Sequence, residues 1–227
     1  MQGVLILSGG LDSTTALYQL RAQKREVCCL TFDYGQRHAI EWSRARGICR
    51  TLGVEWHLVK LEALTSLLDQ SALTNPSIPV PEGRYTDESM RATVVPNRNM
   101  ILLSIAIGHA INVGADSVII GAHGGDHRTY PDCRPTFLKI MRRAALVCDW
   151  HPVKLEVPFL GMTKADIVRI GASLDVPFYQ TWSCYAPVQP TKVDDLHMHC
   201  GVCGACVDRK EAFRLAGVAD STCYHKR

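Results

Sequence analysis

The segment Leu7-Ser8-Gly9-Gly10-Leu11-Asp12-Ser13-Thr14-Thr15 decides the fold of this chain. It follows an aliphatic run, Val4-Leu5-Ile6-Leu7, which is typical of a buried parallel strand. Residues 16–20 come next, with the apolar spacing of a helix packed on that strand. A strand, a glycine-rich turn and a helix in this order predict a phosphate-binding loop.

The residue types of the turn suit an anion. Gly9 and Gly10 leave no side chain between the backbone N–H groups and a phosphate. Ser13 and the two threonines after it add hydroxyl donors, and the helix N-terminus adds about half a positive charge. Asp12 would repel a phosphate unless a Mg²⁺ ion lies between them, and oxygen ligands suit that ion. The alternative is a plain glycine turn capped by Ser13, which leaves this combination of groups unexplained.

The segment contains neither the Gly-Lys-Ser/Thr of a Walker A loop nor the three spaced glycines of a dinucleotide site. It resembles the pyrophosphate loop of the ATP-pyrophosphatase (PP-loop) superfamily. Members of that superfamily cleave ATP between the α and β phosphates and leave an adenylated substrate. The resemblance implies an ATP site formed by Leu7, Ser8, Gly9, Gly10, Leu11, Asp12, Ser13, Thr14, Thr15, Ala16 and Leu17, together with Arg37.

Composition limits the class of protein. The 227 residues include 47% hydrophobic and 21% charged residues, which is ample for a core and ordinary for a soluble protein. A net charge of +3 is too small to indicate nucleic-acid binding. The sequence shows no membrane-length apolar run and no signal-peptide pattern, so we expect a cytoplasmic protein without a membrane partner.

Strand and helix patterns alternate along the chain and predict an α/β fold with a doubly wound, mostly parallel sheet. Further strands are expected over residues 26–32, 55–59, 117–121 and 155–157, and helices over 39–52, 100–113, 136–148 and 164–174. Thr163 is expected to cap the last of these helices. Residues 62–93 form a loop-rich insertion and a candidate lid.

Polar segments follow two of these strands, at the strand ends where ligands of open α/β sheets bind. Residues 33–38 follow the second strand, and residues 122–135 follow the fourth strand and form the densest polar stretch. Both should face the crevice of the first loop. A zinc site in the second segment and a salt bridge within it are alternatives. The ionisable candidates are Arg37, His123, Asp126, His127, Asp132 and Arg134.

Arg98 lies just before the helix expected over residues 100–113 and shortly after Pro96. The proline favours an extended residue before it, and Asn97 or Asn99 is expected to cap the helix. The Arg98 guanidinium can then reach into the crevice and bind a phosphate or a carboxylate. A solvated arginine in a capping turn is the alternative.

Four of the ten cysteines have the spacing of a metal site, C-x₁₅-C-x₂-C-x₂-C, formed by Cys184, Cys200, Cys203 and Cys206. Glycines at positions 201 and 204 allow the backbone to wrap around an ion, and four thiolates favour structural zinc. His197 or His199 is an alternative fourth ligand, and an iron–sulfur cluster an alternative to zinc. We therefore divide the chain into a PP-loop ATP-pyrophosphatase domain, 1–181, and a zinc-binding module packed on it, 182–227.

Five motifs and the cysteine trio occur in order and point to one family. They are the first loop, Thr31-Phe32-Asp33-Tyr34-Gly35-Gln36-Arg37-His38, Val95-Pro96-Asn97-Arg98-Asn99, Tyr130-Pro131-Asp132-Cys133-Arg134 and Trp182-Ser183-Cys184-Tyr185. On these motifs the chain resembles the 7-cyano-7-deazaguanine synthase family over essentially its full length. The resemblance implies conversion of 7-carboxy-7-deazaguanine and ammonia to the nitrile precursor of queuosine and archaeosine. It also implies ATP, Mg²⁺, one structural Zn²⁺ per chain, a homodimer and no nucleic-acid partner.

The resemblance also suggests roles for single residues. Asp12 would hold Mg²⁺, and Arg98 would stabilise the α-phosphate or the substrate carboxylate. His123, Asp126 and His127 are candidate bases for ammonium. The substrate-binding candidates are Tyr130, Asp132 and Arg134. Residues 97 and 122–127 depart from the commonest pattern of the family, which leaves the contacts to the base and to ammonia open.

Three other functions are weighed against this one. A related ligase could transfer the activated carboxylate to a protein or another amine. A tRNA-modifying PP-loop enzyme is disfavoured because the chain has no basic, aromatic-rich appendage and no catalytic cysteine pair. A zinc-stapled nucleic-acid binder is disfavoured by the absence of lysine and arginine clusters on one element.

Overall fold

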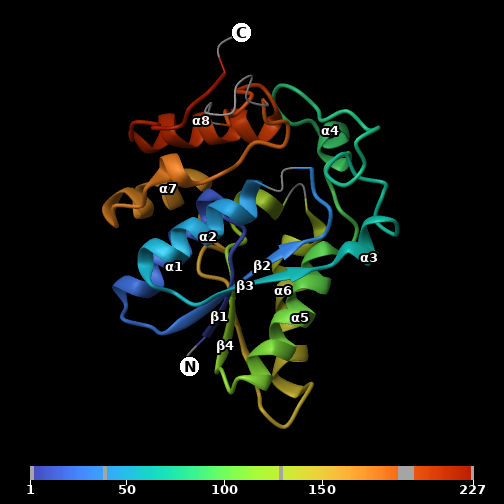
Figure 1. Ribbon diagram of the computed structural model, residues 1–227, viewed down its shortest axis with the longest axis vertical. Helices are drawn as coiled ribbons and strands as arrows, with labels where there is room; N and C mark the ends of the chain where they lie inside the picture. Colours follow the sequence, from blue (N-terminus) through green and yellow to red (C-terminus); the bar gives the residue numbers. More distant parts are fainter. Residues whose placement is uncertain (1–2, 38–39, 128–129, 189–196, 226–227) are drawn as a thin grey trace.

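The computed structural model describes residues 3–37, 40–127, 130–188 and 197–225. Five parallel strands form one sheet in the order β3-β2-β1-β4-β5 (Figure 1). The strands are β1 (Gly3–Ile6), β2 (Val27–Asp33), β3 (Trp56–Lys60), β4 (Ser117–Ile120) and β5 (Lys154–Glu156). The predicted α/β class and parallel sheet are confirmed.

Strand β1 is the centre of the sheet. Val4 lies opposite Cys28 of β2 on one side and opposite Val118 of β4 on the other. The chain builds outward from β1 to β3, then returns to the other side for β4 and β5. Because the strand order reverses at β1, the loops that follow β1 and β4 run in opposite directions and leave a crevice between them. Ligands of open α/β sheets bind in such a crevice.

Helices cover both faces of the sheet (Figure 1). On one face lie α1 (Leu11–Ala22), α2 (Ile40–Leu52) and α7 (Lys164–Ser173), and on the other lie α5 (Arg98–Asn112) and α6 (Pro135–Val147). The predicted Thr163 cap of α7 is confirmed, because its hydroxyl accepts from the Asp166 N–H. Helix α1 begins at Leu11, earlier than the 16–20 pattern indicated, because the chain turns directly after Gly10.

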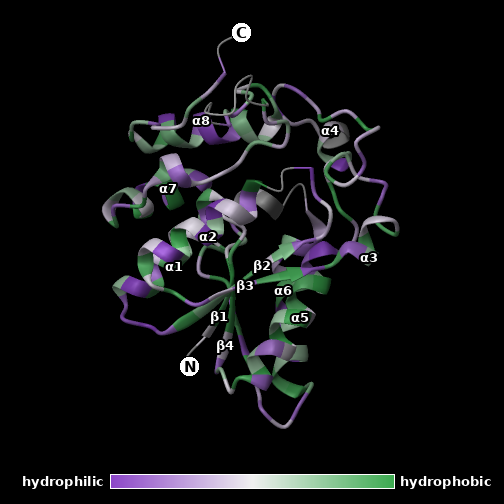
Figure 2. Cartoon of the chain, viewed as in Figure 1, coloured by the Kyte–Doolittle hydropathy of each residue, from purple (hydrophilic) through white to green (hydrophobic). Residues whose placement is uncertain are grey.

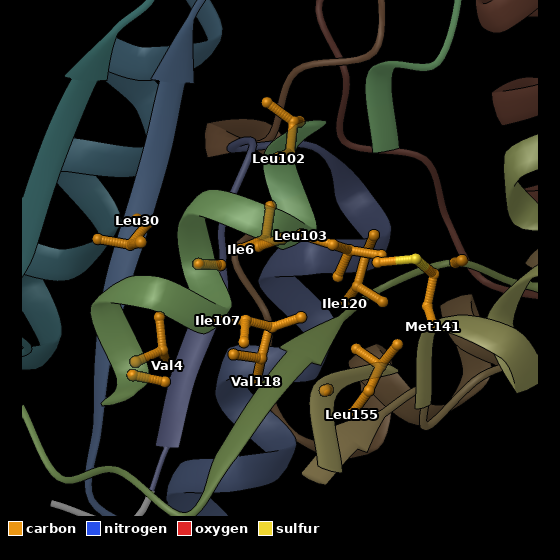
Figure 3. Packing of buried hydrophobic residues seen from close by; sticks show 14 of the residues in the cluster. Val4, Ile6, Leu30, Leu102, Leu103, Ile107, Val118, Ile120, Met141 and Leu155 are labelled. Carbon is orange, nitrogen blue, oxygen red and sulfur yellow. The ribbon is translucent and has the colours of Figure 1, made fainter. Parts of the chain in front are cut away.

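The core consists of two layers, one on each face of the sheet. Val4 and Ile6 of β1 pack under Leu103 and Ile107 of α5 (Figure 3), while the alternate residues of β1 face α1. Helix α5 is mostly hydrophobic in Figure 2, as expected for a helix that lies across three strands. Burying one such aliphatic side chain contributes about 1.5–3 kcal/mol, so the two layers fix the sheet on which the loops are mounted.

The insertion over residues 62–93 is loop-rich, as predicted, and contains two short helices, α3 (Glu62–Thr65) and α4 (Asp87–Arg91). It contacts the C-terminal segment, since the Gly83 N–H donates to the Val202 carbonyl at 2.8 Å and Glu82 forms a β-bridge with Cys203. The insertion is therefore attached to the cysteine-containing part of the chain.

Helix α8 (Gly204–Ala216) packs on α7 and closes the molecule on that side (Figure 1). Its Phe213 belongs to the same core layer as α1, with its ring 5.0 Å from that of Phe178. The domain boundary at residue 181 stays a prediction. No helix in the described part of the chain is both long and apolar enough to span a membrane.

Arg209 of α8 is a buried charge with a full set of partners. Its guanidinium donates to the Phe178 carbonyl at 2.8 Å and to the Thr181 and Thr222 hydroxyls at 2.9 and 2.8 Å. Asp220 lies 3.9 Å away and offsets the charge. These bonds tie α8 to the segment that follows η3 (Phe178–Gln180).

Replacing this arginine by an apolar side chain should destabilise the fold. In Arg209→Met, the buried acceptors and Asp220 lose their partner, so the free energy of unfolding should fall by about 3 kcal/mol or more. Urea unfolding followed by circular dichroism measures it. Arg214→Met is the matched control on the exposed face of α8, where the arginine pairs with Glu211, and it should leave unfolding nearly unchanged. Equal effects of the two substitutions would contradict the anchoring role of Arg209.

Candidate functional site

The carboxyl ends of β1, β2 and β4 open onto one cavity. Its walls come from the loop after β1, the end of β2, the start of α5, the residues after β4 and the segment 182–185. The first residue of α7, Lys164, and an N-terminal residue of α8, Ala205, complete the lining. Segments distant in sequence therefore meet around the first loop, as the strand-end argument predicted.

The first loop presents donors to the cavity. Within the loop the Gly10 N–H donates to the Ser8 hydroxyl at 3.2 Å, and the Ser8 and Ser13 hydroxyls lie 3.0 Å apart. Helix α1 begins at Leu11 without a side-chain cap, so its first N–H groups are directed toward the cavity mouth rather than satisfied by a side chain. Backbone donors, hydroxyls and a helix N-terminus together form a site for phosphate.

Only part of the predicted nucleotide-binding stretch reaches the cavity. Its members that line the cavity are Leu7, Ser8, Gly10, Leu11, Asp12 and Ser13. Thr15 is buried and its hydroxyl donates to the Leu11 carbonyl at 2.9 Å, while Leu17 lies in the core. Arg37 also lies apart from the described lining, because its guanidinium donates to the Ile78 carbonyl of the insertion at 3.0 Å.

Asp12 stands between two groups on the cavity wall. Its Oδ2 lies 3.6 Å from Lys164 Nζ and 3.7 Å from His123 Nε2. Its Oδ1 is buried and has no hydrogen-bond partner among the described residues. A buried carboxylate oxygen normally has a partner, so this oxygen is suited to a cation that binds with the phosphates.

His123 is held in one orientation. Its side chain is 3% exposed, and the Gly125 N–H donates to its Nδ1 at 3.0 Å. Because Nδ1 accepts a hydrogen bond, we infer that the neutral ring carries its proton on Nε2, which faces Asp12. The backbone of Asp126 and His127 belongs to η1 (Gly124–His127), but their side chains lie outside the described residues.

Another part of the cavity, here called the tyrosine end, contains Arg98 among tyrosines. Its guanidinium carbon is 5.6 Å from the centre of the Tyr130 ring, and Tyr34 and Tyr185 also line this end. Burial by itself lowers the pKa of Arg98, but the oxygens of the neighbouring tyrosines, Tyr34 first, and the Asp132 carboxylate raise it above its usual value. Burial likewise raises the pKa of Tyr34 and of Tyr185, so both phenols keep their protons and can donate. This end combines a fixed positive charge with flat aromatic faces.

The start of α5 is capped from a distant segment. Asn97 occupies the N-cap position with φ 56° and makes no side-chain cap, and Asn99 lies within the helix, so the prediction that one of these two side chains caps it is wrong. Instead Asp132 Oδ2 accepts from the Asn99 N–H at 2.8 Å, and the Asn99 amide donates to Cys133 Sγ at 3.1 Å. The Asp132 carboxylate thereby fixes the start of the helix that carries Arg98.

The three substrate-binding candidates separate in the structure. Tyr130 lines the cavity, whereas Asp132 caps α5 and Arg134 is the exposed N-cap residue of α6. Neither of the last two belongs to the described lining of the cavity. Their direct contact with substrate therefore stays a prediction, and the structure gives Asp132 a positioning role.

Lys164 and Trp182 are among the lining residues to which sequence reasoning gave no role in the site. Lys164 is the first residue of α7, the helix that follows β5, so the rule that selected the other strand ends applies here too. Trp182 was noted only as part of a family motif, because its place in the site depends on the hydrogen bond from its N–H to the Gly9 carbonyl at 2.9 Å. Glu41, near the start of α2, is a third lining residue that the sequence did not single out.

The four predicted cysteines come together. The sulfurs of Cys184, Cys200, Cys203 and Cys206 all lie within 4.8 Å of one another, and all four side chains are buried. Two of the sulfur pairs are 4.0 Å apart. Four sulfurs about 2.3 Å from one ion are roughly 3.8 Å apart in a tetrahedron, so this spacing fits a single metal ion. A multi-iron cluster is larger than one ion and would hold its sulfurs further apart.

The surroundings favour a thiolate at Cys200, whereas hydrogen bonds with the neighbouring sulfurs raise the pKa of Cys184 and of Cys206. The N–H groups of Val202 and Cys203 donate to Cys200 Sγ at 3.5 and 3.3 Å. Hydrogen bonds from the thiols of Cys184, Cys203 and Cys206 hold the pKa of Cys200 well below its usual value. His199 is engaged elsewhere, since its Nε2 accepts from the Ser183 N–H at 3.1 Å. Cys184 is therefore the fourth member of the cluster.

Comparison with protein families and curated relatives agrees with the site. A family model described as "Queuosine biosynthesis protein QueC" matches residues 2–217. A 7-cyano-7-deazaguanine synthase from Methanoregula boonei is 48% identical over 220 residues, which are 97% of this chain and 97% of the relative. The corresponding enzyme from Hahella chejuensis is 45% identical over 223 residues, 98% of this chain and 93% of the relative.

Solved structures share the fold at low identity. The U34-tRNA thiolase NcsA from Methanococcus maripaludis, solved with its [4Fe-4S] cluster, has a TM-score of 0.51 at 16% identity. The match covers 83% of this chain and 62% of the thiolase. NMN synthetase from Francisella tularensis has a TM-score of 0.50 at 14% identity, and the match covers 97% of this chain and 79% of the synthetase. At these identities the likeness concerns the fold alone.

Removing one thiol of the cluster should release its metal. Cys203→Ser should lose the bound ion and several kcal/mol of unfolding free energy, because the binding energy of a structural metal is folding energy. Metal analysis of the purified protein and thermal unfolding measure the two effects. Cys148→Ser, at an exposed cysteine on the far side of the sheet, is the control and should keep both values. A Cys203→Ser protein with a full metal content would exclude the four-cysteine site.

Proposed function

The chain belongs to the QueC family of queuosine biosynthesis proteins, as its motifs indicated, and we propose that it makes 7-cyano-7-deazaguanine from 7-carboxy-7-deazaguanine, ammonia and ATP. The observation that carries this proposal is one cavity lined both by the phosphate loop and by Arg98 among tyrosines. ATP and a planar acid can meet in such a cavity.

The chemistry requires activation of a carboxylate, because its own leaving group would be oxide. Attack of the carboxylate on the α-phosphate of ATP forms an acyl adenylate and expels pyrophosphate. Ammonia then displaces AMP and gives the amide. A second ATP activates the amide oxygen, and loss of AMP and a proton leaves the nitrile. The phosphate loop suits this sequence because it can hold the departing pyrophosphate.

The loop end of the cavity would bind the β and γ phosphates. The Gly10 N–H and the Ser8 and Ser13 hydroxyls already lie together there. Lys164 adds a positive charge from the start of α7. Its ammonium group, which pairs with Asp12 in the free protein, can pair with a phosphate oxygen instead. Mg²⁺ would neutralise charge on the α–β bridge, and Asp12 Oδ1 is the oxygen suited to hold it.

The tyrosine end would bind the acid. The Arg98 guanidinium can hold the substrate carboxylate through two parallel hydrogen bonds while attack takes place. The faces of Tyr130 and its neighbours suit a flat deazaguanine ring, and the protonated phenol of Tyr34 can donate to it. Because this charge lies in the same cavity as the phosphate loop, it would hold the carboxylate where it can meet the α-phosphate.

His123 is better suited to orient Asp12 than to act as the base. Its Nδ1 accepts the Gly125 N–H, and its Nε2 faces the Asp12 carboxylate. A ring that already carries its proton on the cavity side can donate there but not accept. Asp126 and His127 stay as the predicted bases for ammonium.

We further propose structural Zn²⁺ in the four-cysteine cluster, a homodimer and a cytoplasmic location. The zinc proposal is supported by four buried thiols at single-ion spacing. The location follows from the need for ATP and for reduced thiols in the same compartment.

The direct test supplies the purified protein with ATP, Mg²⁺, ammonium and 7-carboxy-7-deazaguanine. The expected products are the nitrile, AMP and pyrophosphate, resolved by liquid chromatography and mass spectrometry. Formation of ADP and orthophosphate would contradict cleavage between the α and β phosphates. Accumulation of the acyl adenylate without amide or nitrile would indicate transfer to a different amine.

Asp12→Asn should reduce kcat/KM by about 10²-fold or more, because the charge that holds Mg²⁺ against the phosphates is lost. The Asn side chain keeps the size of the original, so circular dichroism should show a folded protein. Asp116→Asn, at the exposed opposite end of β4, is the matched control and should keep full activity. An active Asp12→Asn enzyme would exclude the metal-binding role.

Arg98→Lys should raise the KM for 7-carboxy-7-deazaguanine by about tenfold or more, because lysine cannot form the two parallel bonds of a guanidinium. The KM for ATP should change far less. Arg50→Lys, on the exposed end of α2, is the control. A change in the ATP KM alone would instead assign Arg98 to the α-phosphate.

A further inference from the structure

One short segment, residues 181–184, touches both the phosphate loop and the cysteine cluster. The Trp182 N–H donates to the Gly9 carbonyl at 2.9 Å. Gly9 has φ +83°, and a Cβ there would lie 2.4 Å from the Glu41 carbonyl of α2. The loop is thus confined between α2 and Trp182, so the position of Trp182 helps to set the position of the loop.

Trp182 is fixed from its other side by the cluster. Its indole N–H donates to the carbonyl of Cys184 at 2.8 Å, and its ring lies 4.1 Å from that of His199. His199 in turn accepts from the Ser183 N–H and precedes Cys200. The Trp182 side chain is 1% exposed, so it has no room to move independently of these neighbours.

Helix α8 provides a second connection. It begins at the cluster, with Cys203 as its N-cap residue and Cys206 in its first turn. It also carries Arg209, whose guanidinium donates to the hydroxyls of Thr181 and Ser183 at 2.9 and 3.0 Å. Both ends of the segment are therefore held by elements that start from cysteines of the cluster.

We propose that Trp182 is a positioning residue that couples metal binding at the four-cysteine cluster to nucleotide binding at the phosphate loop. The proposal rests on the ATP site proposed above. An ion that draws four thiols together orders the segment 181–184 and so pre-forms the loop. The nucleotide then binds at a smaller cost in conformational entropy. Because coupling between two binding equilibria is reciprocal, nucleotide must tighten metal binding by the same factor.

The experiment measures Zn²⁺ affinity of the full-length protein by competition with a chromophoric chelator. It is done with and without saturating α,β-methylene-ATP, which resists cleavage between the α and β phosphates. Isothermal titration of the analogue into metal-loaded and metal-free protein gives the reciprocal factor. The analogue should tighten Zn²⁺ binding and Zn²⁺ should tighten binding of the analogue by the same factor, at least about fivefold, which lies in the usual range for coupled sites.

Trp182→Phe isolates the link. It keeps the backbone N–H to Gly9 and a ring beside His199, but it removes the indole bond to Cys184. Both ligands should still bind, while the coupling factor falls toward one. Trp150→Phe replaces a fully exposed tryptophan and is the matched control. Its coupling factor should equal that of the unaltered chain. Arg209→Lys, which loses the two hydrogen bonds from Nη1 to the Thr181 and Ser183 hydroxyls, should lower the coupling factor as well.

The outcomes are distinguishable. An analogue that does not bind the metal-loaded protein would exclude the proposed ATP site itself. An analogue that binds without changing Zn²⁺ affinity would leave that site in place and overturn the coupling. An equal factor in Trp182→Phe and the unaltered chain would assign the linkage to global folding, and it would also overturn the role of Trp182.

Discussion

The reversal of strand order at β1 is the constraint on which the site depends. Because β2 and β3 lie on one side of β1 and β4 and β5 on the other, the loops after β1 and β4 diverge and leave a crevice between them. The buried layers on both faces of the sheet keep the strand ends in register. Every group assigned to the chemistry is mounted at this edge, on a strand end, a helix start or the segment that follows Thr181.

The two ends of the cavity differ in how they handle charge. At the loop end, hydroxyls and backbone donors satisfy one another, and Asp12 lies near Lys164, so the donors can be transferred to a phosphate at small cost. At the tyrosine end, Arg98 is half-buried among tyrosines and near the Asp132 carboxylate, so its charge is only partly solvated. A partly solvated cation gains more from an incoming carboxylate than a fully solvated one does. The cavity is thus suited to two different anions at fixed places.

Local sequence signals predicted the fold and the cluster well. Aliphatic runs marked the strands, and the spacing of Cys184, Cys200, Cys203 and Cys206 identified the four residues that the structure brings together. Roles that depend on distant contacts were not predictable from spacing. Asp132 lies in a polar run that suggested substrate binding, yet it caps α5 through the Asn99 N–H, a contact across 33 positions. Trp182 joins the site through a bond to Gly9, 173 positions earlier in the chain. No periodicity or local motif encodes such a pair.

The turn after β4, over residues 122–125, is held by close packing around Asp12. His123 can face Asp12 only if the chain turns sharply after it, and the Gly125 N–H donates back to its ring. A Cβ on Gly125 would lie 2.8 Å from that ring, and one on Gly124 would lie 2.9 Å from the Met162 carbonyl. The His123 ring is accommodated only where residue 125 has no side chain, whereas the absence of a side chain at Gly124 makes room for the Met162 carbonyl. Met162 lies two residues before Lys164, the other neighbour of Asp12, so the turn after β4 and the start of α7 are packed against each other around this carboxylate.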